Sequence, residues 1–151
     1  AIKKSCEIKK YFVDKDVSEK GLRMLLNFGH TFAHAIEAEN NYSKKVSHVE
    51  AVLSGIILAA RLSHIKKICS YEVLRIIEET YKENNLKYTT KKYSKQKNIK
   101  NLIPFLSNDK KNNDKKINFI LLKDIGRTTM PNKSKISTNE IKMLSRKITQ
   151  Y

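Results

Sequence analysis

The sequence lacks the features that identify several classes of protein. It has only two cysteines, Cys6 and Cys69, which excludes a disulfide scaffold and a cysteine-only zinc module. Its most apolar stretch, residues 49–62, is interrupted by polar residues and is shorter than the roughly 20 residues that cross a membrane. No signal-peptide pattern opens the chain. These absences predict a protein of a reducing, cytoplasmic compartment with no membrane-spanning helix.

The length and the remaining composition fit one domain. A chain of 151 residues with 40% hydrophobic and 30% charged residues can bury a core, and its composition is not that of a disordered protein. We expect residues 1–151 to form a single domain without internal repeats. Because the chain starts at Ala1 and not at Met, we also expect it to begin inside a longer protein.

Acidic residues are scarce relative to basic ones. The chain has 15 Asp and Glu against 31 Lys and Arg, a formal charge of +16, and this excess would suit a nucleic-acid-binding surface. However, 26 of the basic residues are lysines spread along the chain, and Asn and Ile, which share AT-rich codons with Lys, are also abundant. No aromatic-basic motif accompanies the charge. The charge therefore favours compositional bias, and we expect no nucleic-acid partner.

Hydrophobic periodicity predicts a mainly α fold with one short β element. The expected helices span 1–11, 21–39, 48–67, 71–84, 99–106 and 137–149. The segments 13–20 and 86–97 are expected to be a loop and a basic linker, and 117–122 a strand followed by a turn at 125–127. Ser47 and Glu50 have the spacing of a capping box, which places His48 in a first helical turn, and Ser137 and Glu140 repeat that spacing.

The expected helix at 21–39 carries a polar stripe. At about 100° per residue, spacings of 4, 3, 4 and 3 fall on one helix face. Here they select Arg23, Asn27, His30, His34 and Glu37. The rest of this helix is apolar, so we expect it to be buried with its stripe facing a polar cavity, where titratable groups are candidates for a functional site. A solvated face is the ordinary alternative, but solvated faces in this chain carry Lys and Glu.

Histidines in this region have the spacing of metal ligands. His30 and His34 are one helical turn apart and could bind one metal, although no Glu follows His30 as in the metalloprotease motif. His48 lies 18 residues after His30, at the start of a helix that can fold back antiparallel. Two or three histidines with an open position would suit catalytic zinc. His64, beside two lysines near a helix end, needs no such role.

These residues resemble a known family. Residues 21–23 followed by the run N-F-G-H-T-F-A-H-A-I-E at 27–37 closely resemble the signature of the 3-dehydroquinate synthases. The segment 48–52 resembles the family's second histidine motif, and 5–9 its lysine-bearing helix. Residues 109–111 and 119–126 resemble its closing segment. The resemblance spans essentially the whole chain, in order.

The resemblance implies the helical C-terminal domain of a two-domain lyase of the shikimate pathway, which leads to aromatic amino acids. This family converts 3-deoxy-arabino-heptulosonate 7-phosphate to 3-dehydroquinate and phosphate. The route comprises transient oxidation, phosphate elimination, re-reduction, ring opening and aldol closure. The family's N-terminal α/β domain, whose glycine-rich motif this chain lacks, would bind NAD and supply a carboxylate ligand to zinc. The full enzyme would be a homodimer.

The resemblance also implies roles in metal binding and proton transfer. His30 and His48 would be ligands of Zn²⁺ (or Co²⁺), which would polarise the carbon being oxidised. His34 would belong to the proton relay and contact the phosphate, because an imidazole can both accept and donate a proton. Glu19 falls where the family has an acidic relay residue.

Four further residues would bind the phosphorylated substrate. Lys9, Arg23 and Asn27 would contact its carboxylate and hydroxyls, with Lys9 also taking part in catalysis and Arg23 binding as a bidentate fork. Lys110 would close over the anionic substrate, although Lys111 beside it is an equal candidate. Without the resemblance, Lys9, Lys110 and Glu19 would be ordinary solvated side chains.

Two positions depart from the family. Ala33 and Val49 stand where the family has glycine, and a glycine beside a ligand permits close backbone approach. These departures predict a slightly remodelled site or a lower metal affinity. Within the enzymes, a sister sugar-phosphate cyclase or a metal-dependent polyol dehydrogenase remains an alternative. A basic nucleic-acid-binding module and a non-catalytic remnant are alternatives from other classes.

Overall fold

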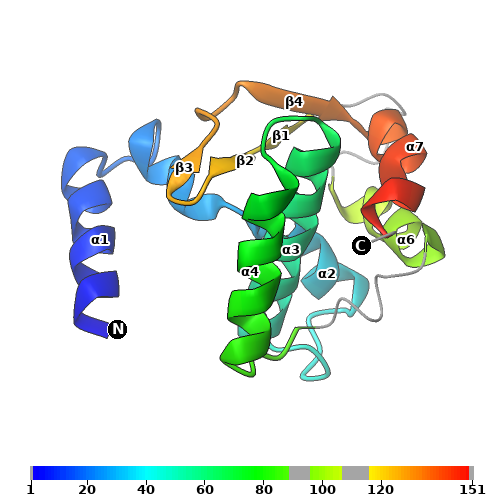
Figure 1. The fold of residues 1–151 in the computed structure, drawn as a ribbon, viewed down its shortest axis with the longest axis horizontal. Helices are drawn as coiled ribbons and strands as arrows, with labels where there is room; N and C mark the ends of the chain where they lie inside the picture. The colour runs from blue at the N-terminus through cyan, green and yellow to red at the C-terminus, as the bar shows by residue number, and fades with distance from the viewer. Residues whose placement is uncertain (1, 89–95, 107–115, 150–151) are drawn as a thin grey trace.

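A computed structural model describes residues 2–88, 96–106 and 116–149, which form a mainly α-helical fold with two small sheets (Figure 1). The helices are α1 (Ile2–Lys15), the 3₁₀ helix η1 (Leu22–Asn27), α2 (His30–Glu39), α3 (His48–Ile65), α4 (Tyr71–Glu83), α6 (Gln96–Leu106) and α7 (Thr138–Ile148). The strands are β1 (Lys116–Phe119), β2 (Leu122–Asp124), β3 (Arg127–Thr128) and β4 (Ser134–Ser137). The predicted fold class is confirmed.

The core is built around α3, which packs against α2, α4 and α7 (Figure 1). Ile57, Leu58 and Leu62 of this helix are completely buried. Its 18 residues have a mean hydropathy of 1.2, which is long and apolar enough to cross a membrane, but 56% of the helix is buried within the fold. The apolar surface of α3 is thus covered by the neighbouring helices, as expected for the central helix of a core.

The helices α2 and α3 run antiparallel and approach most closely where two glycines meet. His48 at the start of α3 contacts Glu37 near the end of α2, whereas Gly55 lies farther along α3, against Gly29 just before α2. A Cβ atom on Gly55 would lie 2.3 Å from the carbonyl oxygen of Gly29 and 2.8 Å from the amide nitrogen of Ala33. A larger residue therefore cannot occupy position 55 unless the backbone shifts. The predicted antiparallel return of the second helix is confirmed.

The prediction of one continuous helix at 21–39 is wrong. The chain forms η1, then turns at Phe28 and Gly29 and restarts as α2. Gly29 has a φ of 83°, the left-handed region that glycine enters at little cost and that interrupts a right-handed helix. The predicted stripe is consequently divided between two elements, and its members are not aligned on one helix face.

The single strand expected at 117–122 is divided between two sheets. β1 pairs antiparallel with β4, with Ile117 opposite Ile136, and β2 pairs antiparallel with β3. The predicted turn forms at Ile125 and Gly126, between β2 and β3. Phe119 of β1 is buried against Phe32 of α2, with ring centroids 5.2 Å apart. The sheet residues thereby complete the core formed by the helices.

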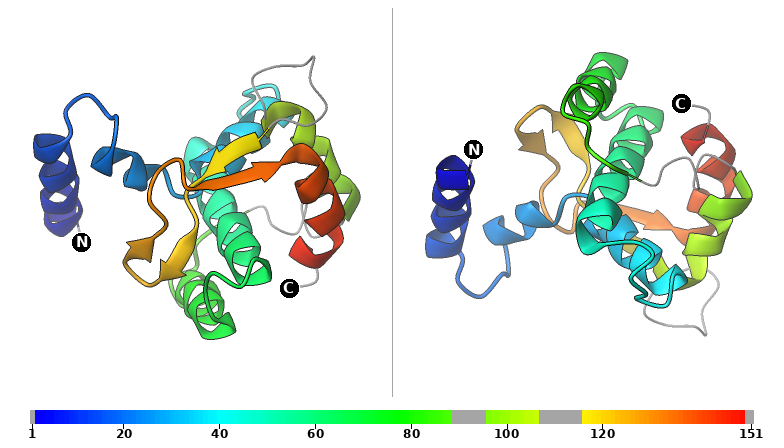
Figure 2. Two further views of the ribbon diagram at one scale, coloured as in Figure 1. Left: turned by 90° about the horizontal axis from the view of Figure 1, so that it is seen from above. Right: turned by 90° about the horizontal axis from the view of Figure 1, so that it is seen from below.

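The N-terminal helix lies apart from this core. α1 continues to Lys15, four residues beyond its expected end, and contains no buried residue. Its main packing partner is η1. Both views in Figure 2 show α1 at one end of the molecule, away from the other helices.

The remaining helices follow the prediction closely. α4 ends one residue earlier than expected, α6 begins three residues earlier, and α7 is capped by Ser137, which accepts a hydrogen bond from the Glu140 amide at 3.1 Å. The expected linker at 86–97 lies mostly outside the described residues.

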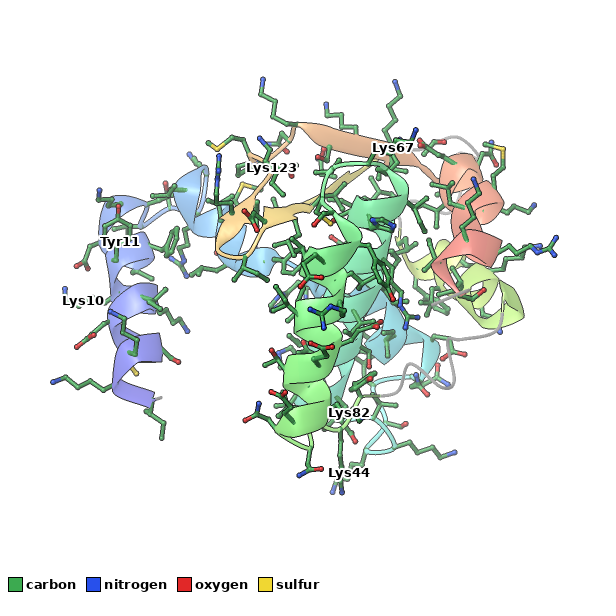
Figure 3. All side chains as sticks on the ribbon, viewed as in Figure 1. Lys10, Tyr11, Lys44, Lys67, Lys82 and Lys123 are labelled. Carbon is green, nitrogen blue, oxygen red and sulfur yellow. The ribbon has the colours of Figure 1, made fainter. Side chains whose placement is uncertain are left out.

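Lysines are distributed over the whole molecule. Figure 3 labels Lys10 on α1, Lys44 before α3, Lys67 after α3, Lys82 on α4 and Lys123 on β2, and all five are exposed. Exposed lysines thus occur on separate parts of the fold, in keeping with the predicted compositional bias.

Candidate metal and substrate site

Three histidines gather where α2 and α3 meet. His30, the first residue of α2, is half-buried, and its ring centroid lies 5.7 Å from that of His34 and 6.2 Å from that of His48. His34 and His48 are exposed at the edges of this cluster. The structure therefore brings together the pair predicted as metal ligands and the histidine predicted to relay protons.

The position of His48 is fixed by the predicted capping box. The hydroxyl of Ser47 accepts a hydrogen bond from the Glu50 amide at 3.2 Å, and the Glu50 carboxylate accepts one from the Ser47 amide at 3.0 Å. These bonds from the backbone and side chain of Ser47 hold the pKa of Glu50 below its usual value. His48 is thus attached to a helix end whose amides are satisfied.

The two positions that depart from the family have different environments. Ala33 is completely buried, and its amide donates to the Gly29 carbonyl at 3.0 Å, facing Gly55. Val49 is 65% exposed, so its extra methyl groups do not crowd the core. The extra methyl of Ala33 is therefore accommodated where α3 carries a glycine.

A carboxylate whose role the sequence did not assign contacts His48. The Oε1 atom of Glu37 lies 2.8 Å from Nδ1 of His48, and the Glu37 side chain is only 17% exposed. The polar stripe included Glu37, but its contact with His48 depends on the antiparallel register of α2 and α3. The sequence spacing alone gave no signal for that contact.

Three of the predicted polar residues meet at η1. The carboxylate of Glu19 accepts a hydrogen bond from Asn27 Nδ2 at 2.7 Å, and its other oxygen lies 3.6 Å from Arg23 Nε. Arg23 also donates from Nη1 to the carbonyl of Val17 at 2.9 Å. Glu19 thus connects Arg23 and Asn27, and a substrate anion would compete with Glu19 for the guanidinium.

A second carboxylate that the sequence did not single out organises the loop before η1. Asp16 accepts hydrogen bonds from the backbone amides of Lys20, Gly21 and Arg23, at 3.1, 2.8 and 3.0 Å. Desolvation by itself would raise the pKa of Asp16, but the hydrogen bonds from Gly21, Arg23 and Lys20, together with the Arg23 charge, outweigh it and keep the pKa below the usual value of an aspartate. Asp16 therefore positions the loop that carries Glu19.

Two cavities meet at these residues. One, of about 360 Å³, is lined by Lys9 and Arg23, and the other, of about 390 Å³, by His34 and Thr31. Glu19, Asn27 and His30 line both cavities. The structure thus places Lys9, from the separate helix α1, in the same region as the histidines.

Other parts of the chain also reach this region. The sheet and the loop before β4 contribute Asn118 and Asn132 to the larger of the two cavities, and no sequence motif marked either residue. Lys110 and Lys111 lie outside the described residues. His64 lines a different cavity, of about 510 Å³, beside Lys67 and Cys69.

His30 and His48 could supply some, but not all, of the ligands that a metal ion needs. Among the described residues, no group of three His, Cys, Asp or Glu side chains is arranged to hold a metal ion. His30 and His48 supply two imidazoles, and His48 is in contact with a carboxylate, the usual environment of a metal-binding histidine. A catalytic zinc takes three protein ligands, so these residues would form a partial site.

Comparisons with known proteins identify the family. The family profile described as 3-dehydroquinate synthase C-terminal matches residues 1–112. The chain is 47% identical over 126 residues to the 3-dehydroquinate synthase of Pelagibacter ubique and 42% identical to that of Dictyoglomus turgidum. Each alignment covers 83% of this chain but only 34% of the relative, so the chain spans about a third of the length of these curated relatives.

The fold is also found in solved structures. A 2-deoxy-scyllo-inosose synthase in complex with carbaglucose-6-phosphate, NAD⁺ and Co²⁺ superposes with a TM-score of 0.66 at 22% identity, over 87% of this chain and 35% of that one. A second structure of a 2-deoxy-scyllo-inosose synthase gives a TM-score of 0.65 at 20% identity. At these identities the likeness extends to the fold alone. The profile and the sequence relatives show that the chain belongs to the 3-dehydroquinate synthase family, in its C-terminal region.

Proposed function

We propose that this chain is the metal- and substrate-binding part of a 3-dehydroquinate synthase. The whole enzyme would be a lyase that converts 3-deoxy-arabino-heptulosonate 7-phosphate to 3-dehydroquinate and phosphate in the shikimate pathway. The observation that carries the proposal is the meeting of His30 and His48, from two helices, with His30 also lining the cavity that contains Lys9, Arg23 and Asn27.

His30 and His48 would hold a divalent metal ion, Zn²⁺ or Co²⁺. Imidazole suits both metals, and the structural relative was solved with Co²⁺. When bound, the ion supplies Lewis-acid polarisation of a substrate oxygen. The third protein ligand would come from an N-terminal domain, which would also bind most of the NAD.

The polar residues around the histidines would bind and orient the substrate. Lys9 and Arg23 provide cationic groups for its carboxylate, and Asn27 offers an amide for its hydroxyls. His34 lies exposed in the adjoining cavity, where it can exchange a proton with the substrate and with solvent. Glu19 would hold Arg23 and Asn27 in place and take part in the relay. Lys110 is proposed from the sequence alone.

The wider setting follows from the same assignment. We expect a homodimer in the cytoplasm, with neither a membrane nor a nucleic acid as partner. A sister sugar-phosphate cyclase shares this fold, but the identity of 47% to a 3-dehydroquinate synthase favours the synthase.

The proposal is tested on the protein as it occurs in its own cell, purified with whatever nucleotide-binding part accompanies it. With NAD and zinc, it should release phosphate from 3-deoxy-arabino-heptulosonate 7-phosphate and not from glucose 6-phosphate. Chelation should abolish turnover, and zinc or cobalt should restore it. The 151-residue chain alone should be inactive, since it spans about 34% of its relatives.

Variants identify the residues responsible. His30→Ala and His48→Ala should each reduce kcat/KM by about 1,000-fold or more, because several kcal/mol of Lewis-acid stabilisation is lost and each 1.36 kcal/mol is tenfold. His64→Ala, in the separate cavity, is the matched control and should retain activity. Turnover that resists chelation, or that survives both histidine substitutions, would refute the proposal.

A further inference from the structure

Each of the two proposed metal ligands has one ring nitrogen engaged within the chain. Nδ1 of His30 lies 3.4 Å from the carbonyl oxygen of Phe28, and Nδ1 of His48 lies 2.8 Å from Oε1 of Glu37. A carbonyl or carboxylate oxygen can only accept a hydrogen bond, so Nδ1 must be the protonated nitrogen in each contact. The lone pair of each neutral imidazole is then on Nε2.

The two contacts differ in strength and origin. The partner of His30 is a neutral backbone carbonyl at a long distance, and no substitution can remove it. The partner of His48 is an ionisable side chain at a short distance, and charge-assisted bonds of this kind are about twice as strong as neutral ones. Because the His48 side chain is 62% exposed, its orientation depends on this contact with Glu37.

The position of Glu37 suits it to orient the ring of His48. Its side chain is 17% exposed, so water competes for it less than for a surface carboxylate. It lies one helical turn after His34 on α2, and the antiparallel register aligns it with the first residue of α3. The contact thus spans the same pair of helices that brings the two histidines to 6.2 Å.

From this geometry we infer that Glu37 is a positioning residue for the metal centre: it fixes the Nδ1–H tautomer and the ring orientation of His48, and so directs Nε2 toward the ion. The inference rests on the proposed function for the identity of the metal site. It adds a residue to which neither the sequence motif nor the family resemblance gave a role. Partners of this kind typically change metal affinity by about 10–100-fold.

The tautomer can be measured without any metal. In the ¹⁵N-histidine-labelled chain at about pH 9, where an ordinary histidine is neutral, long-range ¹H–¹⁵N spectra should show His48 protonated at Nδ1. Glu37→Ala should shift His48 toward the Nε2–H form, whereas Glu37→Gln keeps an oxygen acceptor and should retain much of the wild-type tautomer. Glu39→Gln is the matched control, because Glu39 lies on the same helix but contacts Asn40. An unchanged His48 tautomer in Glu37→Ala would overturn the inference.

Metal affinity provides the second measurement. In the protein with its natural nucleotide-binding part, competition with a chromophoric chelator should show zinc bound about 10–100-fold more weakly in Glu37→Ala, with a smaller loss in Glu37→Gln and none in Glu39→Gln. Equal zinc affinity in the wild type and Glu37→Ala would overturn the role of Glu37 while leaving the proposed function intact. If the wild type binds no zinc or cobalt, the proposed metal centre fails, and with it the role of Glu37 toward a metal, whatever the tautomer.

Discussion

The helices α1 and α3 each carry a residue of the proposed site but are held in the fold very differently. α1 has no buried residue, and its apolar side chains Ile2 and Tyr11 are 83% and 52% exposed. α3 buries ten of its residues in the centre of the core. The proposed metal ligand His48 thus lies on the helix that forms the centre of the core, and the proposed substrate ligand Lys9 on the weakly packed one. The comparison indicates that the helix carrying His48 is held by the core, whereas the position of Lys9 depends on the packing of α1 against η1.

The largest expected effect is a loss of stability, which should be large for a substitution in the core and small for one in α1. Phe32→Ala removes a completely buried ring that packs on Phe119, and should lower the free energy of unfolding by about 3–5 kcal/mol. Ile8→Ala in α1 removes a side chain that is 47% exposed, and should change the free energy of unfolding by less than about 0.5 kcal/mol. Urea unfolding followed by circular dichroism measures both. Similar losses in the two variants would show that α1 is packed as firmly as the core.

A smaller loss of stability is expected when Gly55, at the crossing of α2 and α3, is replaced. Gly55→Ala would place a methyl group 2.3 Å from the Gly29 carbonyl, and such overpacking should cost about 1–3 kcal/mol. Gly21→Ala, near η1, would place its Cβ at an ordinary 3.7 Å from Asp16 and serves as the matched control. The same denaturation experiment decides the outcome. An unchanged midpoint for Gly55→Ala would mean that α2 and α3 can separate at little cost.

A local effect is expected at Asp16. Replacing it with alanine removes three backbone hydrogen bonds, so the amides of Lys20, Gly21 and Arg23 should exchange with deuterium about tenfold faster or more. Exchange in α3 should stay the same, because the loop lies outside the core. Faster exchange throughout the chain would instead show that the loop and the core unfold together.

The hydrogen bonds that Asp16 accepts should make the structure of this loop depend on pH. The pKa of Asp16 is lower in the folded chain than in the unfolded chain, so its stabilising contribution is complete above the unfolded pKa and is lost as the pH falls through the lower, folded pKa. The amide proton shift of Gly21 should therefore stay constant on acidification to about pH 4 and change only below it. In Asp16→Asn this transition should be absent.

The smallest expected effect concerns the reactivity of the two cysteines, one on α1 and one just after α3. Cys6 on α1 is exposed, whereas Cys69 is 8% exposed, and burial, followed by the nearby charge of Asp124, raises the pKa of its thiol. Because the thiolate is the reactive form, Ellman's reagent at pH 8 should modify Cys6 at least about tenfold faster than Cys69. Cys6→Ser should remove the fast phase. Equal rates would indicate that the region around Cys69 opens readily.

Features set by neighbouring residues in the chain could be predicted from the sequence. The capping box at Ser47 and the cap at Ser137 formed where expected, since each needs only a suitable pair three residues apart. The amphipathic helix at α4 was also predicted closely. The gathering of His30, His34 and His48 followed from helix spacing and an antiparallel return.

Features set by distant contacts could not be predicted. The apolar periodicity of the sequence runs through Gly29 without interruption. The helix nevertheless stops there, because α3 lies against Gly29 and Ile56 occupies the space that a side chain would need. The single strand expected at 117–122 is divided because its first part pairs with β4 and its last residue, in β2, pairs with β3. The contacts of Glu37 with His48, and of Asp16 with three amides, likewise depend on how segments are placed in space.

The close approach of α3 to Gly29 makes the separation of His30 and His48 sensitive to the angle at which the two helices cross. The two helices touch backbone to backbone at Gly55, and His48 lies seven residues away, about 10 Å along the helix axis. A change in the crossing angle would therefore move His48 relative to His30 by roughly 2 Å for every 10° of rotation, which is comparable to the length of a metal–nitrogen bond. Because Ile56 fills the space beside Gly29 and Gly55 faces the Gly29 carbonyl, the packing at this crossing bears directly on the separation of the two imidazoles.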